Sequence, residues 1–89
     1  LATTTNTLKI LVNPATDLLQ YEASSGISFQ SSICLYSVSG QCVKQSVSDL
    51  QEGGNIKNLD ISDVEKGVYF LRMQTPDNAF LQQKVIVLK

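Results

Sequence analysis

The sequence predicts an all-β fold, namely an immunoglobulin-like antiparallel β-sandwich of about seven strands. Short runs rich in β-branched and aromatic residues recur at roughly 8–12-residue spacing, with turn residues between them, as is typical of strands joined by tight connections. No segment sustains the period of about 3.6 residues that marks an amphipathic helix. Because a strand with one apolar face needs cover, we expect two sheets packed on each other.

The run GVYFLRMQT at residues 67–75 is predicted to be the central strand. Tyr69, Leu71 and Met73 fall on one face of a period-2 pattern, whereas the other face becomes polar from Arg72 onward. The other strands are therefore expected to pack around the apolar face of this strand.

Turn residues bound the other expected strands. Pro14 removes a backbone donor and ends the first strand at an edge or a corner. Gly40 lies where a positive φ is expected, so residues 32–36 and 41–47 are predicted to form a hairpin. The remaining strands are expected at residues 8–12, 18–23, 56–62 and 79–88.

Three connections are less regular. The polar, glycine-bearing stretch at residues 49–55 is expected to be a loop. Residues 27–30 form either a short strand or an irregular connection. A single helical turn is predicted at residues 62–67, because Ser62 and Glu65 have capping-box spacing and a glycine follows.

The chain is expected to hold one domain, since 89 residues leave no room for a second core. Residues 1–7 are small and polar without periodicity, which suits an exposed leader or linker, so the folded domain is expected at residues 8–89. The expected core is Ile10, Leu19, Tyr21, Ile33, Leu35, Val43, Leu59, Ile61, Tyr69, Leu71, Met73, Val85 and Val87.

The composition disfavours several classes of function. The chain has no histidine, which removes the usual general base near neutral pH and the commonest metal ligand, so neither an enzyme nor a cofactor is expected. With a net charge of −1 and no basic stripe, the chain is not expected to bind nucleic acid. Its apolar runs are far shorter than the roughly 20 residues of a transmembrane helix, and no signal-peptide pattern opens the chain.

Two groups of residues invite site hypotheses. Cys34 and Cys42 sit in strands that flank one turn, and they either form a cross-strand disulfide or remain ordinary buried or half-buried thiols. Asp60, Asp63 and Glu65 could offer oxygens to calcium, but the set of alternate ligands is incomplete. These carboxylates fit better at a strand end and in the first turn of a short helix, so no metal is expected.

The last expected strand, at residues 79–88, is long and apolar toward its end. An unpaired edge of this kind could accept a strand from a partner or from a second copy of the chain. Self-association through this edge is therefore one expectation.

Four motifs span most of the chain: NPAxDxL at residues 13–19, IxLYxxxGxxV at 33–43, LxISxVxxGVYxLxM at 59–73 and KVxV at 84–87. In order and spacing, they resemble the C-terminal sorting domain of proteins exported by the type IX (Por) secretion system. The chain departs from the family pattern at Leu11 and Val12, where a proline usually precedes Asn-Pro, and it has two cysteines that the pattern does not require.

The resemblance implies an immunoglobulin-like sorting signal at the end of a larger cargo protein, recognised in the periplasm by the outer-membrane translocon. It also implies that a sortase commonly cuts in the linker ahead of the domain and attaches the cargo to the cell surface. The expected partners are therefore translocon and sortase proteins, and the expected location is the periplasm in transit, then the cell surface or the extracellular space of a Gram-negative bacterium.

The resemblance also nominates site residues. The positions expected to be read by the translocon are Gly67, Tyr69, Lys84, Val85, Ile86, Val87, Leu88 and Lys89. The matching family motif positions are Asn13, Pro14, Asp17 and Gly40. The alternative is an immunoglobulin-like accessory domain that serves spacing, adhesion or ligand binding in a surface protein.

Overall fold

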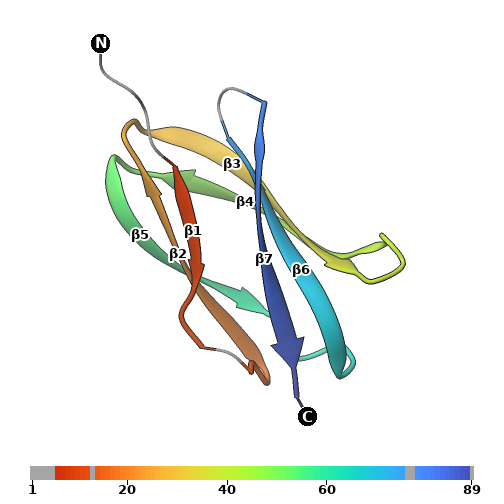
Figure 1. Cartoon of the computed structure of the whole chain (residues 1–89). Helices are drawn as coiled ribbons and strands as arrows, with labels where there is room; N and C mark the ends of the chain where they lie inside the picture. Colours follow the sequence, from red (N-terminus) through yellow and green to blue (C-terminus); the bar gives the residue numbers. More distant parts are fainter. Residues whose placement is uncertain (1–5, 13, 76–77, 89) are drawn as a thin grey trace.

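The computed structural model describes residues 6–12, 14–75 and 78–88, and the described residues contain seven strands and no helix. The all-β prediction is therefore confirmed (Figure 1). The strands are β1 Thr7–Ile10, β2 Leu18–Ser25, β3 Phe29–Ser37, β4 Cys42–Leu50, β5 Gly53–Asp60, β6 Gly67–Gln74 and β7 Phe80–Val87.

The strands form two antiparallel sheets that pack as a sandwich. One sheet has the order β1-β2-β5, and the other has the order β4-β3-β6-β7. In an immunoglobulin constant domain the fourth strand lies in the first sheet, whereas here β4 pairs with β3 in the second. Figure 1 shows the two layers, with β1 and β7 side by side where the sheets approach each other.

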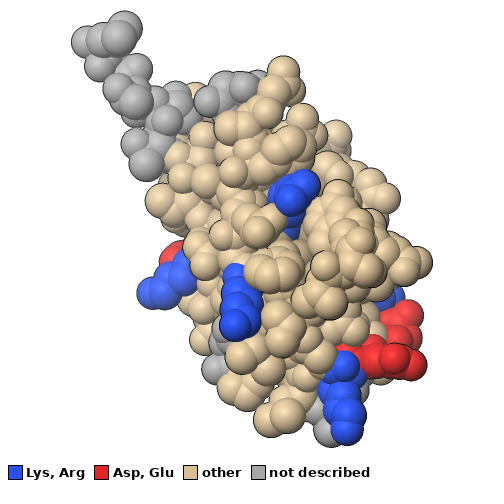
Figure 2. Space-filling view, turned by 45° about the vertical axis from the view of Figure 1, so that its right-hand side comes forward, with Lys and Arg blue, Asp and Glu red and all other residues tan. Residues whose placement is uncertain are grey.

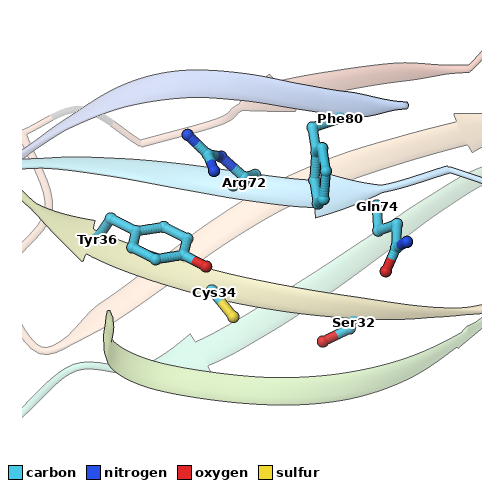
Figure 3. Close-up of a pocket in the computed structure, with 6 residues that line it drawn as sticks. All are labelled: Ser32, Cys34, Tyr36, Arg72, Gln74 and Phe80. Atoms are coloured by element: carbon cyan, nitrogen blue, oxygen red, sulfur yellow. The ribbon is translucent and has the colours of Figure 1, made fainter. Parts of the chain in front are cut away.

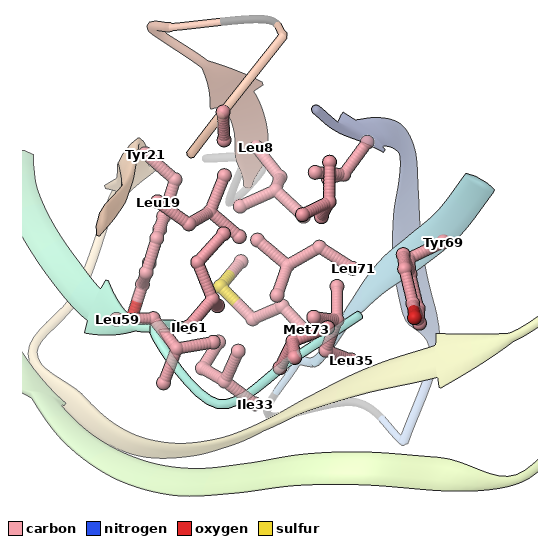
Figure 4. Packing of buried hydrophobic residues seen from close by; sticks show 14 of the residues in the cluster. Leu8, Leu19, Tyr21, Ile33, Leu35, Leu59, Ile61, Tyr69, Leu71 and Met73 are labelled. Atoms are coloured by element: carbon pink, nitrogen blue, oxygen red, sulfur yellow. The ribbon is translucent and has the colours of Figure 1, made fainter. Parts of the chain in front are cut away.

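The core lies between the sheets (Figure 4). It comprises Leu8, Ala15, Leu19, Tyr21, Ala23, Ile33, Leu35, Leu50, Leu59, Ile61, Val64, Tyr69, Leu71, Met73, Val85 and Val87. The expected inward alternation of Tyr69, Leu71 and Met73 is confirmed, because all three side chains are buried. Every other expected core residue is in this cluster as well, apart from Ile10, which is partly buried against it, and Val43.

Placing Val43 in the core was wrong, because its side chain is 38% exposed. The register of β3 and β4 shifts between Leu35 and Tyr36, so that Leu35 faces Lys44 while Tyr36 faces Cys42. Val43 lies on the same face of β4 as the exposed Val47 and Asp49, whereas Leu50 on the other face is buried. The predicted hairpin itself is confirmed, with Gly40 at φ 89 in its turn.

The loop expected at residues 49–55 is largely strand. β4 continues to Leu50, which is buried, and β5 starts at Gly53, so only Gln51 and Glu52 separate them. Gly53 takes φ 101, which lets the chain reverse within this short connection. Asn55 then braces the connection, because its side-chain amide donates to the carbonyl oxygen of Gln51 at 2.8 Å.

The helical turn expected at residues 62–67 is also wrong. The chain makes a β-turn over residues 61–64 instead of a helical turn, and the Val64 N–H closes it by donating to the Ile61 carbonyl oxygen at 2.9 Å. The capping side chain is Asp60, whose carboxylate accepts from the Ser62 N–H at 2.9 Å. Val64 is buried in the core, so this connection packs against the sandwich.

Candidate functional site

The terminal strand β7 is an edge of the four-stranded sheet and part of the core at once. It pairs with β6 along its whole length, with Tyr69 opposite Val85 and Gly67 opposite Val87. Val85 and Val87 are buried, whereas Ile86 is 40% exposed on the other side of the sheet. The strand therefore presents one face to the sandwich interior and one to solvent.

The end of β7 is not the open edge that the sequence suggested. The Ala15 N–H donates to the Ile86 carbonyl oxygen at 2.8 Å, and the Leu88 N–H donates to the Ala15 carbonyl oxygen at 2.8 Å. Ala15 and Val87 thus form a short parallel bridge, and Ala15 is fully buried. The expectation of an unpaired edge is wrong at this end of the strand. We call this contact the Ala15 clamp.

The Ala15 clamp joins residues that lie at opposite ends of the sequence. Pro14 and Asp17 flank Ala15 in the first corner, and the Asp17 carbonyl oxygen accepts from the Ile61 N–H at 2.9 Å. Further along β7, the Gln83 side-chain amide donates to the Leu8 carbonyl oxygen at 2.9 Å. Two groups of residues taken from the family resemblance, the first corner and the terminal strand, therefore form one site. Ala15 itself belongs to the NPAxDxL motif, but its role as the bonded residue was missed.

Gly67 and Tyr69 have structural roles at the start of β6. Gly67 adopts φ 154, and the Tyr69 ring lies 3.6 Å from the position that a Cβ on Gly67 would take. The Tyr69 hydroxyl donates to the Glu65 carbonyl oxygen at 2.8 Å. Tyr69 is only 8% exposed, so most of its ring stabilises the fold and little of it is presented to a partner.

Of the other nominated positions, Gly40 lies apart from the clamp. Gly40 sits in the turn between β3 and β4, and β4 is the opposite edge of the sheet from β7. Asn13 and Lys89 lie outside the described residues. The structure therefore does not gather all family positions into one surface.

The carboxylates near residue 60 have protein partners. Asp63 forms an ion pair with Lys44 at 2.8 Å, and the hydrogen bond from Lys44 lowers the pKa of the Asp63 carboxyl. Asp60 accepts from the Ser62 N–H. Among the described residues, no group of three or more cysteine, aspartate or glutamate side chains is placed to hold a metal ion.

The two cysteines are free thiols in this structure, with Cys34 half-buried and Cys42 exposed. The Cys42 thiol lies 3.2 Å from the Lys44 carbonyl oxygen, to which it donates. Desolvation, followed by hydrogen bonding with Cys34, raises the pKa of Cys42. Of the two alternatives left open by the sequence, the structure has the unbonded one.

The fold and the clamp together define an immunoglobulin-like module whose terminal strand is tied to its first corner. Residues 9–88 match the profile of the secretion system C-terminal sorting domain, and the chain belongs to this family. It is a type IX secretion sorting signal, which directs export to the cell surface or extracellular space of Gram-negative bacteria. No helix in the described part of the chain is long and apolar enough to cross a membrane.

Solved structures share the fold at low identity. A β-glucosidase from Listeria innocua, in complex with glucose, aligns with a TM-score of 0.54 and 15% identity over 97% of this chain, which spans 16% of that protein. The CARDB domain of a Pyrococcus furiosus protein, in complex with di-metal ions, aligns with a TM-score of 0.51 and 16% identity over 94% of this chain and 93% of that one. No curated protein sequence matches the chain. These distant neighbours show the fold alone and do not favour an accessory-domain role.

Proposed function

We propose that the outer-membrane translocon reads this sorting domain in the periplasm through one surface made of the terminal strand and the first corner. The observation that carries the proposal is the Ala15 clamp, because it fixes the backbone of Ile86 and Leu88 against the corner. Lys84 and Ile86 point away from the core beside the clamp, and they are the side chains that we assign to recognition. Residues 84–89 as a whole are proposed to be essential for export.

A reporter fused ahead of the domain tests this proposal in strains with and without the translocon. We expect surface delivery only with the translocon, and loss of delivery when residues 84–89 are deleted. The deletion also removes the buried Val85 and Val87, so point variants are needed to separate recognition from folding.

Paired substitutions on two edge strands, β7 of one sheet and β5 of the other, separate loss of recognition from loss of folding. Lys84→Glu and Ile86→Ser alter the β7 surface, whereas Lys57→Glu and Ile56→Ser make the same changes on β5, where Ile56 is 58% exposed and Lys57 is half-buried. We expect the β7 variants to lose export while keeping a normal urea midpoint, and the β5 variants to be exported. Equal export by all four folded variants would contradict the proposed recognition surface.

Sortase processing is a second part of the proposal. We assign the cut to the linker at or near residues 1–7, ahead of the domain at residues 8–89, with the released cargo then attached to the cell surface. The family membership supports this assignment, since cleavage ahead of the sorting domain is common in the family. Mass spectrometry of the surface-bound reporter should show a new C-terminus in this region in a strain with the sortase and none in a strain without it.

Self-association through the β7 edge remains a prediction, but the clamp shortens the part of the edge that a second copy could pair with. Ala15 already occupies the backbone groups of Ile86 and Leu88 that a second copy would need at that end of the strand. Size-exclusion chromatography over a range of concentrations would reveal a dimer. An Ala15→Pro variant, which lacks the N–H that bonds to Ile86, should dimerise more readily if this end of the edge can pair.

A further inference from the structure

The outer face of the four-stranded sheet carries a hollow at some distance along the sheet from the clamp. Figure 3 shows side chains from β3, β6 and β7 around it. They are Ser32, Cys34, Tyr36, Arg72, Gln74 and Phe80. The hollow has a volume of about 140 Å³. Because one water takes up roughly 30 Å³ of liquid, this space can hold part of a side chain from another molecule.

Arg72 lines the hollow and is held by contacts with two aromatic side chains and one amide. Its guanidinium carbon lies 4.9 Å from the centre of the Tyr36 ring and 5.4 Å from that of Phe80, so the cation contacts both aromatic side chains. Its Nε and Nη2 atoms both donate to the Gln82 side-chain oxygen, at 3.3 and 3.0 Å. A guanidinium fixed in this way loses little further freedom when it binds a ligand.

The charge of Arg72 is not neutralised by these contacts. Gln82 is a neutral acceptor, and no carboxylate in the described part of the chain forms an ion pair with Arg72. Asp49, which lies on the same face at the far end of β4, accepts a hydrogen bond from Gln30 at 3.2 Å. A guanidinium has five N–H donors, so it keeps donors beyond the two that Gln82 takes.

The surroundings of the hollow are apolar and cationic. Val47 lies across from Ser32 and is 59% exposed, while Phe80 lies across from Gln74 and is 56% exposed. Figure 2 shows a broad uncharged surface with separate Lys and Arg side chains near its middle and toward its edges, and with acidic side chains only at its margins. A second copy of the same face would bring like charges together, so self-pairing is disfavoured here.

We propose that this hollow binds an aspartate or glutamate side chain of a partner protein. The carboxylate would accept from Arg72, where a charge-assisted hydrogen bond is stronger than a neutral one. Apolar residues on either side of it in the partner would cover Val47 and Phe80. The hollow lies on the same outer face of the sheet as Lys84 and Ile86 but nearer the start of β7, and its test does not depend on the proposed reading of the end of β7.

A pair of isosteric peptides tests the proposal on the intact domain. Acetyl-Leu-Glu-Val-amide and acetyl-Leu-Gln-Val-amide differ only in the charge of the central side chain. Titrations followed by ¹H–¹⁵N NMR should show the glutamate peptide binding at least about tenfold more tightly than the glutamine peptide, as one hydrogen bond to a charged group predicts. The shifts should centre on the amides of Cys34, Arg72 and Gln74 and on the Arg72 Nε–H.

Variants establish which cation is responsible. Arg72→Gln should reduce the preference for the glutamate peptide to about onefold, and Arg72→Lys should retain part of it, because lysine keeps the charge without the planar fork. Lys57→Gln, which removes a cation from the other sheet, should leave the preference unchanged. A preference below about twofold in the native domain, no saturable shift with either peptide, or an unchanged preference in folded Arg72→Gln would overturn the proposal.

Discussion

Truncation of Leu71 tests the assignment of the sandwich interior most directly. Leu71 lies on β6 opposite Leu35 and Gln83, and its side chain is fully buried between the sheets. Leu71→Ala removes three carbon atoms, worth roughly 0.8 kcal/mol each in transfer free energy, or about 2.4 kcal/mol. The cavity left in a packed interior raises the expected loss to between about 2.5 and 5 kcal/mol.

A loss of this size is a large fraction of the domain's total free energy of unfolding. An 89-residue domain is expected to have a free energy of unfolding of roughly 4–13 kcal/mol. With a urea m value of about 1 kcal/mol/M, the midpoint should fall by about 2 M or more. Urea titration followed by circular dichroism and tyrosine fluorescence measures this shift. Val68→Ala, at a 38% exposed position on the same strand, is the control. A Leu71→Ala midpoint within about 0.5 M of the native value, or no lower than that of Val68→Ala, would refute the assignment.

Three further predictions concern particular side chains. Gly67→Ala should lower the free energy of unfolding by about 1–3 kcal/mol, because φ 154 strains any residue with a Cβ while the space beside Tyr69 is adequate; an unchanged urea midpoint would count against this. Burial raises the pKa of Tyr21 above 10.0, so its contribution to stability is present below that pH and is lost as the pH rises toward the folded value; Tyr21→Phe should lessen the alkaline loss seen in urea midpoints. Lys44 lowers the pKa of Asp63 below 3.8, so the stability that it adds is present above that pH and is lost as the pH falls through the lower folded value; Asp63→Asn should flatten this acid dependence, which thermal melts at several pH values would detect.

The period-2 alternation of apolar residues was enough to predict the fold class and most of the interior. It placed Tyr69, Leu71 and Met73 inward, because a strand covered on one side must bury alternate side chains. It failed at Val43, because the apolar residues of β4 do not all lie on one face: Val43 and Val47 face solvent, whereas Leu50 faces the core.

Glycines predicted one connection correctly and another wrongly, for a physical reason. The turn predicted at Gly40 is confirmed, whereas the loop predicted at Gly53 and Gly54 is wrong, because both belong to β5. A glycine permits a reversal but does not require one, and Gly54 lies in a paired stretch opposite Ser24. Local sequence therefore marks where a chain can turn, while the sheet partner decides where it does.

The Ala15 clamp was beyond prediction from local sequence because it joins the two ends of the chain. β6 and β7 are neighbours in sequence, so their pairing needs only a short loop to close. The bridge from Ala15 to Val87 instead closes a loop that contains almost the whole domain, and it can form only when both sheets have met. The backbone bonds to Ile86 and Leu88 are thus a property of the completed sandwich. A partner protein that contacts the first corner and the terminal strand together would therefore distinguish a folded sorting signal from the same residues in an unfolded chain.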